Sequence, residues 1–456
     1  MNVHKSKYFY FLGIGGIGMS ALARYFHQKG HIVSGYDKTT TKLTKLLETE
    51  GIKINYEDDI KDIPQHIEDQ PEESTIVFTP AIPSTCIQLN YLLQGGHDII
   101  KRSQILGEIV NNTNGIAVAG THGKTTISTM LAHILTHTEY GCNAFLGGIS
   151  TNYKTNYISS LDSLVTVVEA DEFDRSFLTL KPHMALISSL DADHLDVYGN
   201  EDELRRTFIE FSQKVIQGGL LVTKHELNLE KIEDADHETY SIIDPNADNF
   251  ASDIRVINGT YNFTAKLKNQ QPVDYQLGLP GRHNVENALA ACVIANRLKI
   301  DPKSIGEALK AFQGVYRRFD MHINTENLVY IDDYAHHPTE IEASVMSARE
   351  MFPGRKITAI FQPHLFSRTK DFADEFARSL DLLDEIILLP IYPAREQPIP
   401  GVDSHMLLDK IQNTPCRVVE KSELLSELDE MNLEVLMTLG AGDIDRFIEK
   451  IKTKYN

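Results

Sequence analysis

The chain has 456 residues, more than one ordinary hydrophobic core accommodates, so two to four domains are expected. Its formal charge of −20 argues against nonspecific binding to nucleic acid or to an anionic membrane, because both require clustered cationic side chains. The four cysteines are scattered without a CxxC pair, which argues against a zinc site or disulfide framework and favours a cytoplasmic protein. No run of about 18 apolar residues occurs, so no membrane span is expected.

Short apolar runs alternate with amphipathic stretches along the chain. Strands that are apolar on both faces and alternate with helices indicate parallel sheets covered on both sides. The expected strands are 8–13, 31–37, 74–80, 115–120, 163–171, 183–193, 328–333, 356–363, 385–391 and 434–440, and the clearest helices are 18–29, 125–137, 201–216, 284–298 and 338–351.

Two breaks in this pattern predict domain boundaries. One is the polar turn cluster at 111–115, and the other lies at 314–322, where a helix ends and a new strand series begins. Residues 239–280 carry short, glycine-punctuated strands and are interpreted as an antiparallel insertion or edge. The fold class is therefore α/β with three domains: a Rossmann-like domain (1–110), a central P-loop-type mononucleotide-binding parallel sheet with a small antiparallel part (111–319), and a Rossmann-like C-terminal domain (320–456).

The first motif is the run Gly13-Ile14-Gly15-Gly16-Ile17-Gly18, which satisfies G-x-G-x-x-G between a strand and a helix. Glycines let the backbone approach a pyrophosphate, and the helix N-terminus supplies oriented N–H groups. Asp37 ends the second strand, where a ribose-binding acid would lie. A diphosphate ligand is favoured, although a tight packing turn or an NAD-dependent oxidoreductase also fits this motif alone.

The second motif is AVAGTHGKTT at 117–126, which differs from the P-loop pattern G-x-x-x-x-G-K-[ST] by one position. Val118 stands where the first glycine is required, and the nearest glycine is Gly120. The context of strand, glycine-rich turn and helix nevertheless suits a phosphate loop. Lys124 would reach the terminal phosphates and Thr125 would offer its hydroxyl to Mg²⁺, unless the Gly-Lys-Thr run occurs by chance.

Acidic residues and a histidine follow the next two predicted strands. Glu169-Ala170-Asp171-Glu172 ends one strand, and His194 follows the other within the run DADHLD. The carboxyl ends of parallel strands meet where ligands bind in open α/β sheets, and hard cations prefer oxygen ligands. A solvated acidic turn and a capping histidine are the alternatives. Three strand ends that deliver lysine, glutamate and histidine to one edge favour a metal–nucleotide centre.

Polar residues also cluster before a later predicted helix and at the second predicted domain boundary. Asn284 is a plausible helix N-cap and Asn287 could read a base edge, although capping alone explains both. The paired arginines in Tyr316-Arg317-Arg318-Phe319 could clamp phosphate or form a solvated turn.

The strand end Asp332-Asp333-Tyr334-Ala335-His336-His337-Pro338 gathers two acids, a tyrosine and two histidines at one turn. After the following strand, Arg368 is a candidate anchor for a carboxylate, because the guanidinium fork matches its geometry.

Taken together, these motifs resemble the Mur ligase family of bacterial peptidoglycan synthesis. The matching segments occur in family order from residue 11 to 445, and the short loop that begins at Gly120 is the family's own pattern. They are GIGGIGMSALA, GTHGKTT, VEADEFD, DADHLDVYGN, GRHNVENALAA, GVYRRF, DDYAHHPTE, FQPHLFSRT and GAGDID. Within the family, the chain is most similar to the branch that joins L-alanine to UDP-N-acetylmuramate.

The resemblance implies a set of site residues. The implied ATP-binding residues are Gly120, Thr121, His122, Gly123, Lys124, Thr125, Thr126, His283, Asn284, Asn287, Arg318 and Asp333. The implied UDP-sugar-binding residues are Gly13, Gly15, Gly16, Ile17, Gly18, Asp37 and Arg102. Tyr334, His336 and Arg368 are implied on the amino-acid side. Thr125, Glu169 and His194 are implied as ligands of two Mg²⁺ ions. The implied catalytic set is Lys124, Glu169, His194, His336 and Arg368.

The implied reaction is an ATP-dependent amide ligation through an acyl phosphate, in which the acceptor of the amine proton stays open and His336 is a candidate. The partners are the two substrates, and the protein is expected to be a monomer or homodimer. Arg205-Arg206-Thr207-Phe208 contains no lysine where sister ligases carry a carbamylated one, which favours the alanine-adding branch. Two positions depart from the family pattern. Leu365 stands where many relatives have an arginine, and Arg395 stands where many relatives have a glycine.

A ligase that recycles murein tripeptide is the closest alternative, and a non-catalytic nucleotide-binding regulator is a more distant one. The regulator would need a broken catalytic set, and the motifs of this chain show none.

Overall fold

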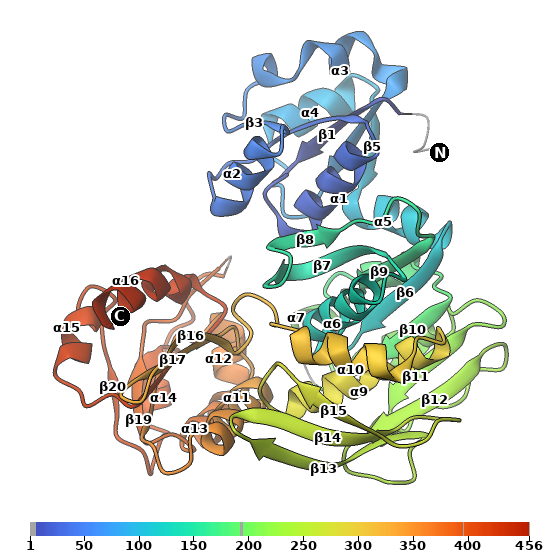
Figure 1. Cartoon of the computed structure of the whole chain (residues 1–456). Helices are drawn as coiled ribbons and strands as arrows, with labels where there is room; N and C mark the ends of the chain where they lie inside the picture. The colour runs from blue at the N-terminus through green and yellow to red at the C-terminus, as the bar shows by residue number, and fades with distance from the viewer. Residues whose placement is uncertain (1–5, 192–194, 395, 456) are drawn as a thin grey trace. The chain divides into compact units, whose positions relative to one another are not determined.

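The computed structural model describes residues 6–191, 195–394 and 396–455 (Figure 1). Its strands form three separate sheets, of five, ten and six strands. The chain packs as two compact units. The first contains residues up to 250 together with 265–273 and 287–309, and the second contains 251–264, 274–286 and the chain from 310 onward.

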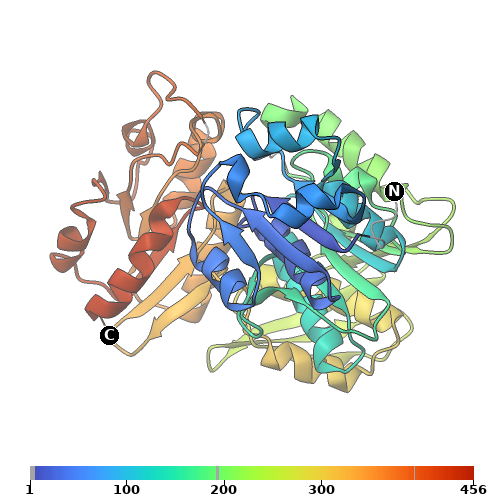
Figure 2. The same cartoon turned by 90° about the horizontal axis from the view of Figure 1, so that it is seen from above.

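The N-terminal sheet is entirely parallel, with strand order β3-β2-β1-β4-β5. Its central strand β1 is buried on both faces: Phe9 and Phe11 pack into one core, and Tyr8, Tyr10 and Leu12 into the other. Helices therefore cover both sides of the sheet (Figure 1 and Figure 2). The elements are β1 Tyr8–Leu12, α1 Ile17–Gln28, β2 Ile32–Tyr36, α2 Lys42–Thr49, β3 Lys53–Asn55, α3 Gln65–Asp69, β4 Ser74–Phe78, α4 Ile87–Gln94, β5 Asp98–Lys101 and α5 Arg102–Asn111.

The ten-stranded sheet has the order β15-β14-β13-β12-β11-β10-β6-β9-β7-β8. Strands β11, β10, β6, β9 and β7 are parallel to their neighbours in this order, and β8 pairs antiparallel with β7. The elements are β6 Asn114–Ala119, α6 Lys124–His137, β7 Asn143–Ser150, β8 Thr155–Ile158, β9 Val165–Glu169, β10 Met184–Ile187, α7 Leu195–Tyr198, α8 Glu201–Ser212, β11 Leu220–Lys224, β12 Asp236–Ser241, β13 Asn249–Ile257, β14 Thr260–Lys266, β15 Val273–Leu277, α9 Arg282–Arg297 and α10 Pro302–Ala311.

The antiparallel region expected at 239–280 begins later than the sequence suggested. Strand β12 runs parallel to β11, and β13 begins parallel to β12 with Tyr240 opposite Asn249. Strands β13 and β14 are joined by Asn258-Gly259, both at positive φ (51° and 72°), which is the signature of a two-residue antiparallel hairpin. The prediction therefore fails for 239–250 and is confirmed for this hairpin.

The C-terminal sheet has the order β16-β17-β21-β18-β19-β20, and only the pairing of β16 with β17 is antiparallel. Along β17, Val329 and Ile331 belong to one core and Tyr330 to the other, so both faces are covered. The elements are β16 Asp320–Asn324, β17 Val329–Asp333, α11 Pro338–Met351, β18 Ile357–Phe361, α12 Phe366–Asp371, α13 Ala373–Leu380, β19 Glu385–Leu388, α14 Ser404–Leu408, β20 Cys416–Val418, α15 Leu424–Asp429, β21 Val435–Leu439 and α16 Ile448–Tyr455.

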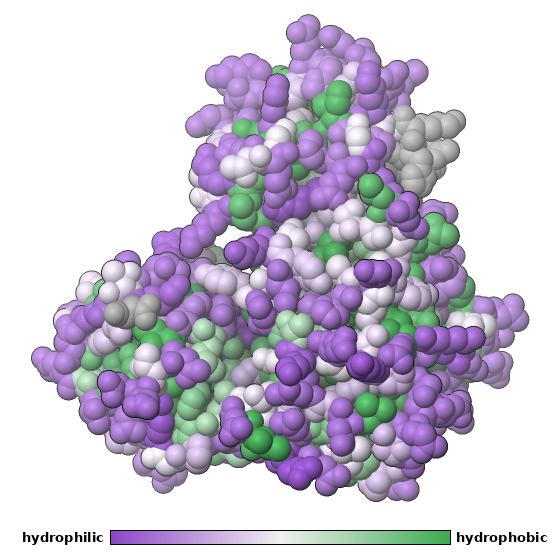
Figure 3. Space-filling view, in the orientation of Figure 1, coloured by the Kyte–Doolittle hydropathy of each residue, from purple (hydrophilic) through white to green (hydrophobic). Residues whose placement is uncertain are grey.

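All ten strands and five helices expected from the sequence are present, and their ends shift by at most four residues except in one strand. The strand expected at 183–193 ends at Ile187, and the last two positions of that expectation lie outside the described residues. Within the described ranges, no helix is both long and apolar enough to cross a membrane. On the face shown in Figure 3, hydrophilic side chains predominate and apolar groups are small and scattered. The three-domain α/β prediction is therefore confirmed, and the sites are to be sought where the parallel strands end.

Candidate active site

The short phosphate loop joins β6 to α6 and depends on two glycines. Gly120 and Gly123 have φ values of 131° and 83°, which side chains rarely adopt. An added Cβ at Gly120 would lie 2.2 Å from Ser188 Oγ, and one at Gly123 would lie 2.8 Å from Asn287 Oδ1. The loop therefore begins at Gly120 because β10 and α9 approach it too closely for larger residues.

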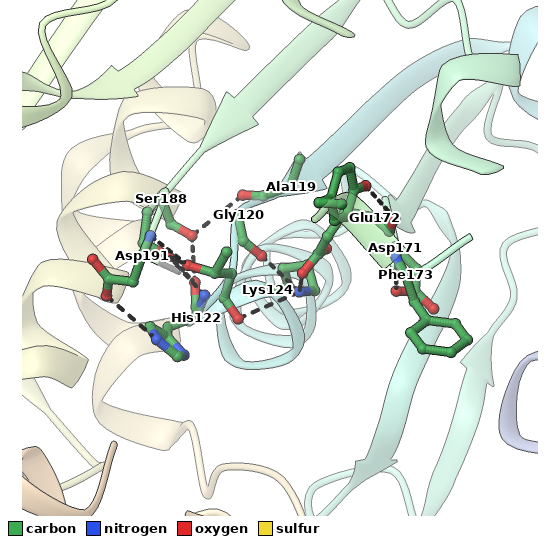
Figure 4. Close-up of polar contacts among 12 residues, drawn as sticks. Ala119, Gly120, His122, Lys124, Asp171, Glu172, Phe173, Ser188 and Asp191 are labelled. Atoms are coloured by element: carbon green, nitrogen blue, oxygen red, sulfur yellow. Dashed lines mark hydrogen bonds and ion pairs between the residues drawn. The ribbon is translucent and has the colours of Figure 1, made fainter. Parts of the chain in front are cut away.

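The segment that follows β10 braces this loop (Figure 4). The backbone N–H of His122 donates to Ser189 Oγ at 2.6 Å, and that of Asp191 donates to Thr121 Oγ1 at 3.0 Å. The imidazole of His122 lies 3.3 Å from the Asp191 carboxylate. The loop thus keeps its shape through bonds to the neighbouring strand end.

Lys124, the first residue of α6, turns back over its own loop. Its Nζ donates to the Gly120 carbonyl at 2.6 Å and to Glu172 Oε1 at 2.8 Å (Figure 4). The two side chains are 13% and 0% exposed. Burial lowers the pKa of Lys124, but the carboxylates of Glu172, Glu169 and Asp171 outweigh it and raise the pKa above its ordinary value. The ammonium is therefore kept charged inside the protein.

Glu169 ends β9 directly beside β6, with Val118 as its partner in the sheet. Its carboxylate occupies the space that a side chain at Gly147 would need, since an added Cβ there would lie 2.1 Å from Oε2. Thr125 is buried in the first turn of α6 at the same sheet edge, and so is Thr126. A carboxylate and a hydroxyl are oxygen donors of the kind that Mg²⁺ prefers.

His194, the third expected metal ligand, lies outside the described residues, as does Arg395. In the part of the chain that the structure describes, no group of three or more His, Cys, Asp and Glu side chains is placed to hold a metal ion. The donors that can be assessed, Thr125 and Glu169, fit a hard cation.

The glycine turn after β1 is built around Asp37. The N–H of Gly15 donates to Asp37 Oδ2 at 2.8 Å, and the N–H of Thr39 donates to Oδ1 at 2.9 Å. The guanidinium of Arg102 covers Gly18 in the first turn of α1, where an added Cβ would lie 2.8 Å from Nη1. Asp37 therefore shapes the turn, while Arg102 brings positive charge to the start of the helix.

A pocket of about 570 Å³ in the first unit connects this turn to Glu169. Gly13, Gly16, Ile17 and Gly18 line one part of it together with Asp37 and Arg102, and Gly147, Glu169 and Asp171 line another. Its size is within the range of small-molecule sites. The structure thus brings the two motifs, more than 150 positions apart, to one cavity.

Cys86 also lines this pocket. Its Sγ donates to Asp58 Oδ1 at 3.4 Å, and burial raises the pKa of its thiol. The side chain is buried, so the thiol stays protonated at neutral pH.

A second group of expected residues meets in the second unit, where β17 ends. Asp333 is buried, which raises its pKa to about 6. The guanidinium of Arg318 lies over the Tyr334 ring, 4.9 Å from its centre, and 3.6 Å from Glu340 Oε1. Nδ1 of His336 lies 3.1 Å from Glu340 Oε2. Asp333, Tyr334 and His336 therefore share the turn between β17 and α11, and Arg318 contacts it from a preceding segment.

Two expectations need correction here. Arg317 is no phosphate clamp: its Nε donates to Asp332 at 2.9 Å and its Nη2 to the Gly440 carbonyl at 2.7 Å, and the side chain is buried. Asn284 is not the N-cap, because α9 already begins at Arg282 and the Asn284 amide donates to the Pro280 carbonyl at 2.5 Å. The backbone N–H groups of Asn284 and Val285 both donate to the Gly281 carbonyl, so the helical turn has already begun before Asn284.

The remaining expected residues are buried near these elements. His283 lies 3.4 Å from Ser347 Oγ, and burial lowers its pKa to about 4. Asn287 lies against Gly123, next to the phosphate loop. Arg368 is 7% exposed in α12, which follows Leu365, a residue at the unusual φ of 69°.

Three residues were not singled out by their sequence pattern: Gly147, Glu172 and Glu340. Glu172 and Glu340 do stand within conspicuous motifs, three positions after Glu169 and two after Pro338. Gly147 belongs to an ordinary Gly-Gly pair, and only the approach of β7 to Glu169 shows why it is small.

Comparison with known proteins gives a consistent result along the whole chain. Three family models match it: the Mur ligase family catalytic domain at 8–114, the Mur ligase middle domain at 118–295, and the Mur ligase glutamate ligase domain at 317–444.

The relatives include UDP-N-acetylmuramate–L-alanine ligase of Porphyromonas gingivalis, which is 48% identical over 449 residues and covers 98% of each chain. Among solved structures, UDP-N-acetylmuramate–alanine ligase of Thermotoga maritima superposes with a TM-score of 0.81 at 28% identity, over 98% of this chain and 99% of that one. A murein peptide ligase from Psychrobacter arcticus has a TM-score of 0.71 at 24% identity, over 98% of both chains, which shows a shared fold. The chain belongs to the Mur ligase family.

Proposed function

We propose that the protein joins L-alanine to the carboxylate of UDP-N-acetylmuramate, using ATP and an acyl-phosphate intermediate, in the synthesis of peptidoglycan precursors in the cytoplasm. The observation that carries this proposal is the pocket that opens both to the glycine turn and to Glu169. A nucleotide-sugar held by that turn presents its far end to the residues around the phosphate loop. Nearly half of the residues are identical to those of L-alanine-adding ligases over almost the whole chain, which supports the choice of substrates.

The UDP-sugar binds through the glycine turn. Backbone N–H groups at the start of α1 and the Arg102 guanidinium stabilise the diphosphate, because both present positive charge to the pocket. The six-residue turn Gly13–Gly18 lets the diphosphate approach the backbone closely, and Asp37 holds the turn and reaches the ribose.

ATP binds at the phosphate loop with Lys124 toward its terminal phosphates. Thr125 and Glu169 would hold Mg²⁺, with His194 as a ligand of a second ion, and the metal would neutralise charge on the transferring phosphoryl group. Lys124 balances charge on the same oxygens while the muramate carboxylate attacks the γ-phosphorus and ADP departs. His122 and Thr121 keep the loop in place through Ser189 and Asp191.

The remaining residues are assigned to ATP and to the amino acid. His283, Asn284, Asn287, Arg318 and Asp333 serve ATP, while Tyr334, His336 and Arg368 receive the amino acid. Arg368 pairs with the L-alanine carboxylate, and it carries this role alone because Leu365 replaces the second arginine of many relatives. The amine then attacks the acyl carbon and phosphate leaves. The domain limits 1–110, 111–319 and 320–456 belong to this proposal, as does a monomeric or homodimeric assembly.

The test is a coupled assay of ADP release with UDP-N-acetylmuramate, ATP and one acceptor at a time. L-Alanine is expected to support release at least about tenfold better than L-serine, glycine or the murein tripeptide, as judged by kcat/KM. Preference for the tripeptide would favour the recycling ligase, which shares the fold. Tight binding of NAD without binding of UDP-N-acetylmuramate would favour an oxidoreductase.

A further inference from the structure

His336 has a fixed pattern of hydrogen bonds at one ring nitrogen. Its Nδ1 lies 2.9 Å from the Tyr334 carbonyl oxygen and 3.1 Å from Glu340 Oε2. Both neighbours are acceptors, so Nδ1 must carry a proton. In the neutral imidazole the other nitrogen, Nε2, then carries a lone pair and acts as an acceptor. The side chain is 17% exposed, so a substrate can reach it.

Glu340 is held in place from two sides. It lies in the first turn of α11, and its Oε2 also accepts from the backbone N–H of His336 at 3.0 Å. Its Oε1 faces the Arg318 guanidinium at 3.6 Å. A carboxylate at this position is stabilised by the helix dipole as well as by the arginine. The orientation of the imidazole therefore rests on a carboxylate that is itself held by two partners.

The other groups that face His336 come from neighbouring segments. The Tyr334 ring meets it edge-on at 5.1 Å, and the His364 ring, which follows β18, has its centre 6.1 Å away. Arg318 lies behind Glu340. Among these contacts, Glu340 is the anion beside the imidazole, which is the arrangement that orients a histidine base in many hydrolytic enzymes.

We propose that Glu340 is a positioning residue that holds His336 in its Nδ1–H form, so that Nε2 of His336 accepts a proton from the ammonium group of the amino-acid substrate. This inference rests on the proposed function. The ammonium gives one proton to Nε2, and the freed lone pair forms the C–N bond to the acyl carbon. The C–O bond to phosphate then breaks, phosphate leaves with the electron pair, and the second amine proton passes to that phosphate.

A purely structural role for Glu340 is the competing explanation. A glutamate in the first turn that reaches back to a backbone N–H resembles half of a capping box. Glu340→Gln separates the two roles, because glutamine still accepts from the backbone N–H but carries no charge. Glu342→Gln, at an exposed position on the same helix, is the matched control.

The test of His336 compares two acceptors in the same enzyme. Hydroxylamine is a neutral nucleophile at about pH 7, so it attacks the acyl phosphate without giving a proton to a base first. His336→Asn, which removes Nε2, is expected to lower L-alanine-dependent kcat by about 100-fold or more. Hydroxylamine-dependent ADP release should stay within about threefold of the native rate. The deficit with L-alanine should shrink as the pH is raised, since the free amine then becomes available in solution.

The test of Glu340 is the pH dependence of kcat with L-alanine. Glu340→Gln is expected to lower kcat about tenfold and to move the acid limb of the profile to lower pH, because the imidazolium loses its neighbouring carboxylate. KM for ATP should change little, and Glu342→Gln should behave as the native enzyme. An unmoved acid limb in a folded Glu340→Gln variant would show a capping role only.

Two outcomes separate this inference from the proposed function. Equal loss of the L-alanine and hydroxylamine reactions in His336→Asn would overturn the assignment of the base and place His336 in acyl-phosphate formation. Absence of ADP release by the native enzyme with UDP-N-acetylmuramate, ATP and L-alanine would instead overturn the proposed function.

Discussion

Among single residues, Lys124 shows how a group proposed to bind ATP is also part of the fold. Its ammonium pairs with Glu172, whose side chain has no exposure to solvent. Removing one member of a buried ion pair leaves the other charge uncompensated, which typically costs about 3–5 kcal/mol. A loss of activity on mutation of Lys124 therefore reports on folding as well as on chemistry unless the two are separated.

The prediction at this position uses a pair of variants. Lys124→Ala is expected to abolish ligation and to lower the free energy of unfolding by about 3 kcal/mol. Lys124→Ala combined with Glu172→Gln should stay inactive but regain at least about half of that stability, because no buried charge remains. Urea unfolding and ADP release measure the two effects. A single variant as stable as the native protein would show that the ion pair contributes nothing.

Among the elements, β7 affects the candidate metal site because Gly147 has no side chain and so leaves room for the Glu169 carboxylate. Gly147→Ala would place a Cβ 2.1 Å from Glu169 Oε2, so the carboxylate must turn away from its present position. The concentration of Mg²⁺ that gives half-maximal activity is expected to rise at least about tenfold, in keeping with the effect of disturbing a metal ligand.

Two further variants sharpen this test. Glu169→Asp in the Gly147→Ala background should recover part of the activity, because the shorter acid leaves room for the methyl group. Gly107→Ala is the control, since its added Cβ would come no closer than 3.2 Å to its neighbours. If Gly147→Ala shows a native Mg²⁺ requirement, Glu169 is not a metal ligand.

Helix α6 contains His133, a buried histidine that makes the free energy of unfolding depend on pH. The Nε2–H of His133 donates to the Ala308 carbonyl at 3.0 Å, and its Nδ1 lies 3.0 Å from the Tyr153 hydroxyl. Burial lowers the pKa of His133 to about 4. In the unfolded chain the pKa of this histidine has its ordinary value near 6.5, so the unfolded chain binds a proton that the folded protein excludes. This contribution is therefore complete above about pH 6.5 and is lost as the pH falls toward 4.

His133→Gln should remove this dependence. Between about pH 6.5 and 4, the slope of unfolding free energy against pH is expected to fall by up to about 1.4 kcal/mol per pH unit. His283 acts in the same direction, and Asp333, whose pKa is raised to about 6, acts in the opposite one. Urea titrations at several pH values give the slopes, with the exposed His405→Gln as control. An unchanged slope would contradict a neutral, buried His133.

Across the molecule, one buried polar residue of the first unit, Asn156, links the glycine turn to the ten-stranded sheet. Asn156 on β8 is fully buried and donates to the Ile17 carbonyl at 2.5 Å and to Ser20 Oγ at 2.9 Å, both in the first turn of α1. Its own carbonyl accepts from buried Arg24, which also pairs with Glu50. These bonds set the glycine turn relative to β7 and Glu169.

Asn156→Asp is expected to keep the contact with Arg24 but to lose both donated bonds. We expect KM for UDP-N-acetylmuramate to rise about tenfold, KM for ATP to stay within about twofold, and stability to fall by about 2 kcal/mol. Asn112→Ala, an exposed amide that bonds within its own helix, is the control. Equal increases in both KM values would show that Asn156 does not act on the sugar site alone.

Much of the fold and of the candidate site can be predicted because the ends of buried strands can be recognised in the sequence. Glu169 ends a buried strand of the ten-stranded sheet and Lys124 follows another, while Asp333 ends a buried strand of the six-stranded sheet. In parallel sheets such positions collect at the carboxyl edge of their own sheet. Short or half-exposed strands such as β3 and β5 carry too few apolar residues to be found. Gly147, Glu172 and Glu340 depend on the approach of segments distant in sequence or on side-chain orientation, which no local pattern encodes.

Cys86 lines the pocket between the glycine turn and Glu169, and its chemistry has a consequence outside the proposed reaction. Oxidants and electrophilic drugs attack the thiolate, and this thiol is held in its protonated form by burial next to the Asp58 carboxylate. The pocket therefore contains a sulfur atom without offering a reactive one. An inhibitor designed for this cavity therefore gains its affinity from shape and charge rather than from a covalent bond to Cys86.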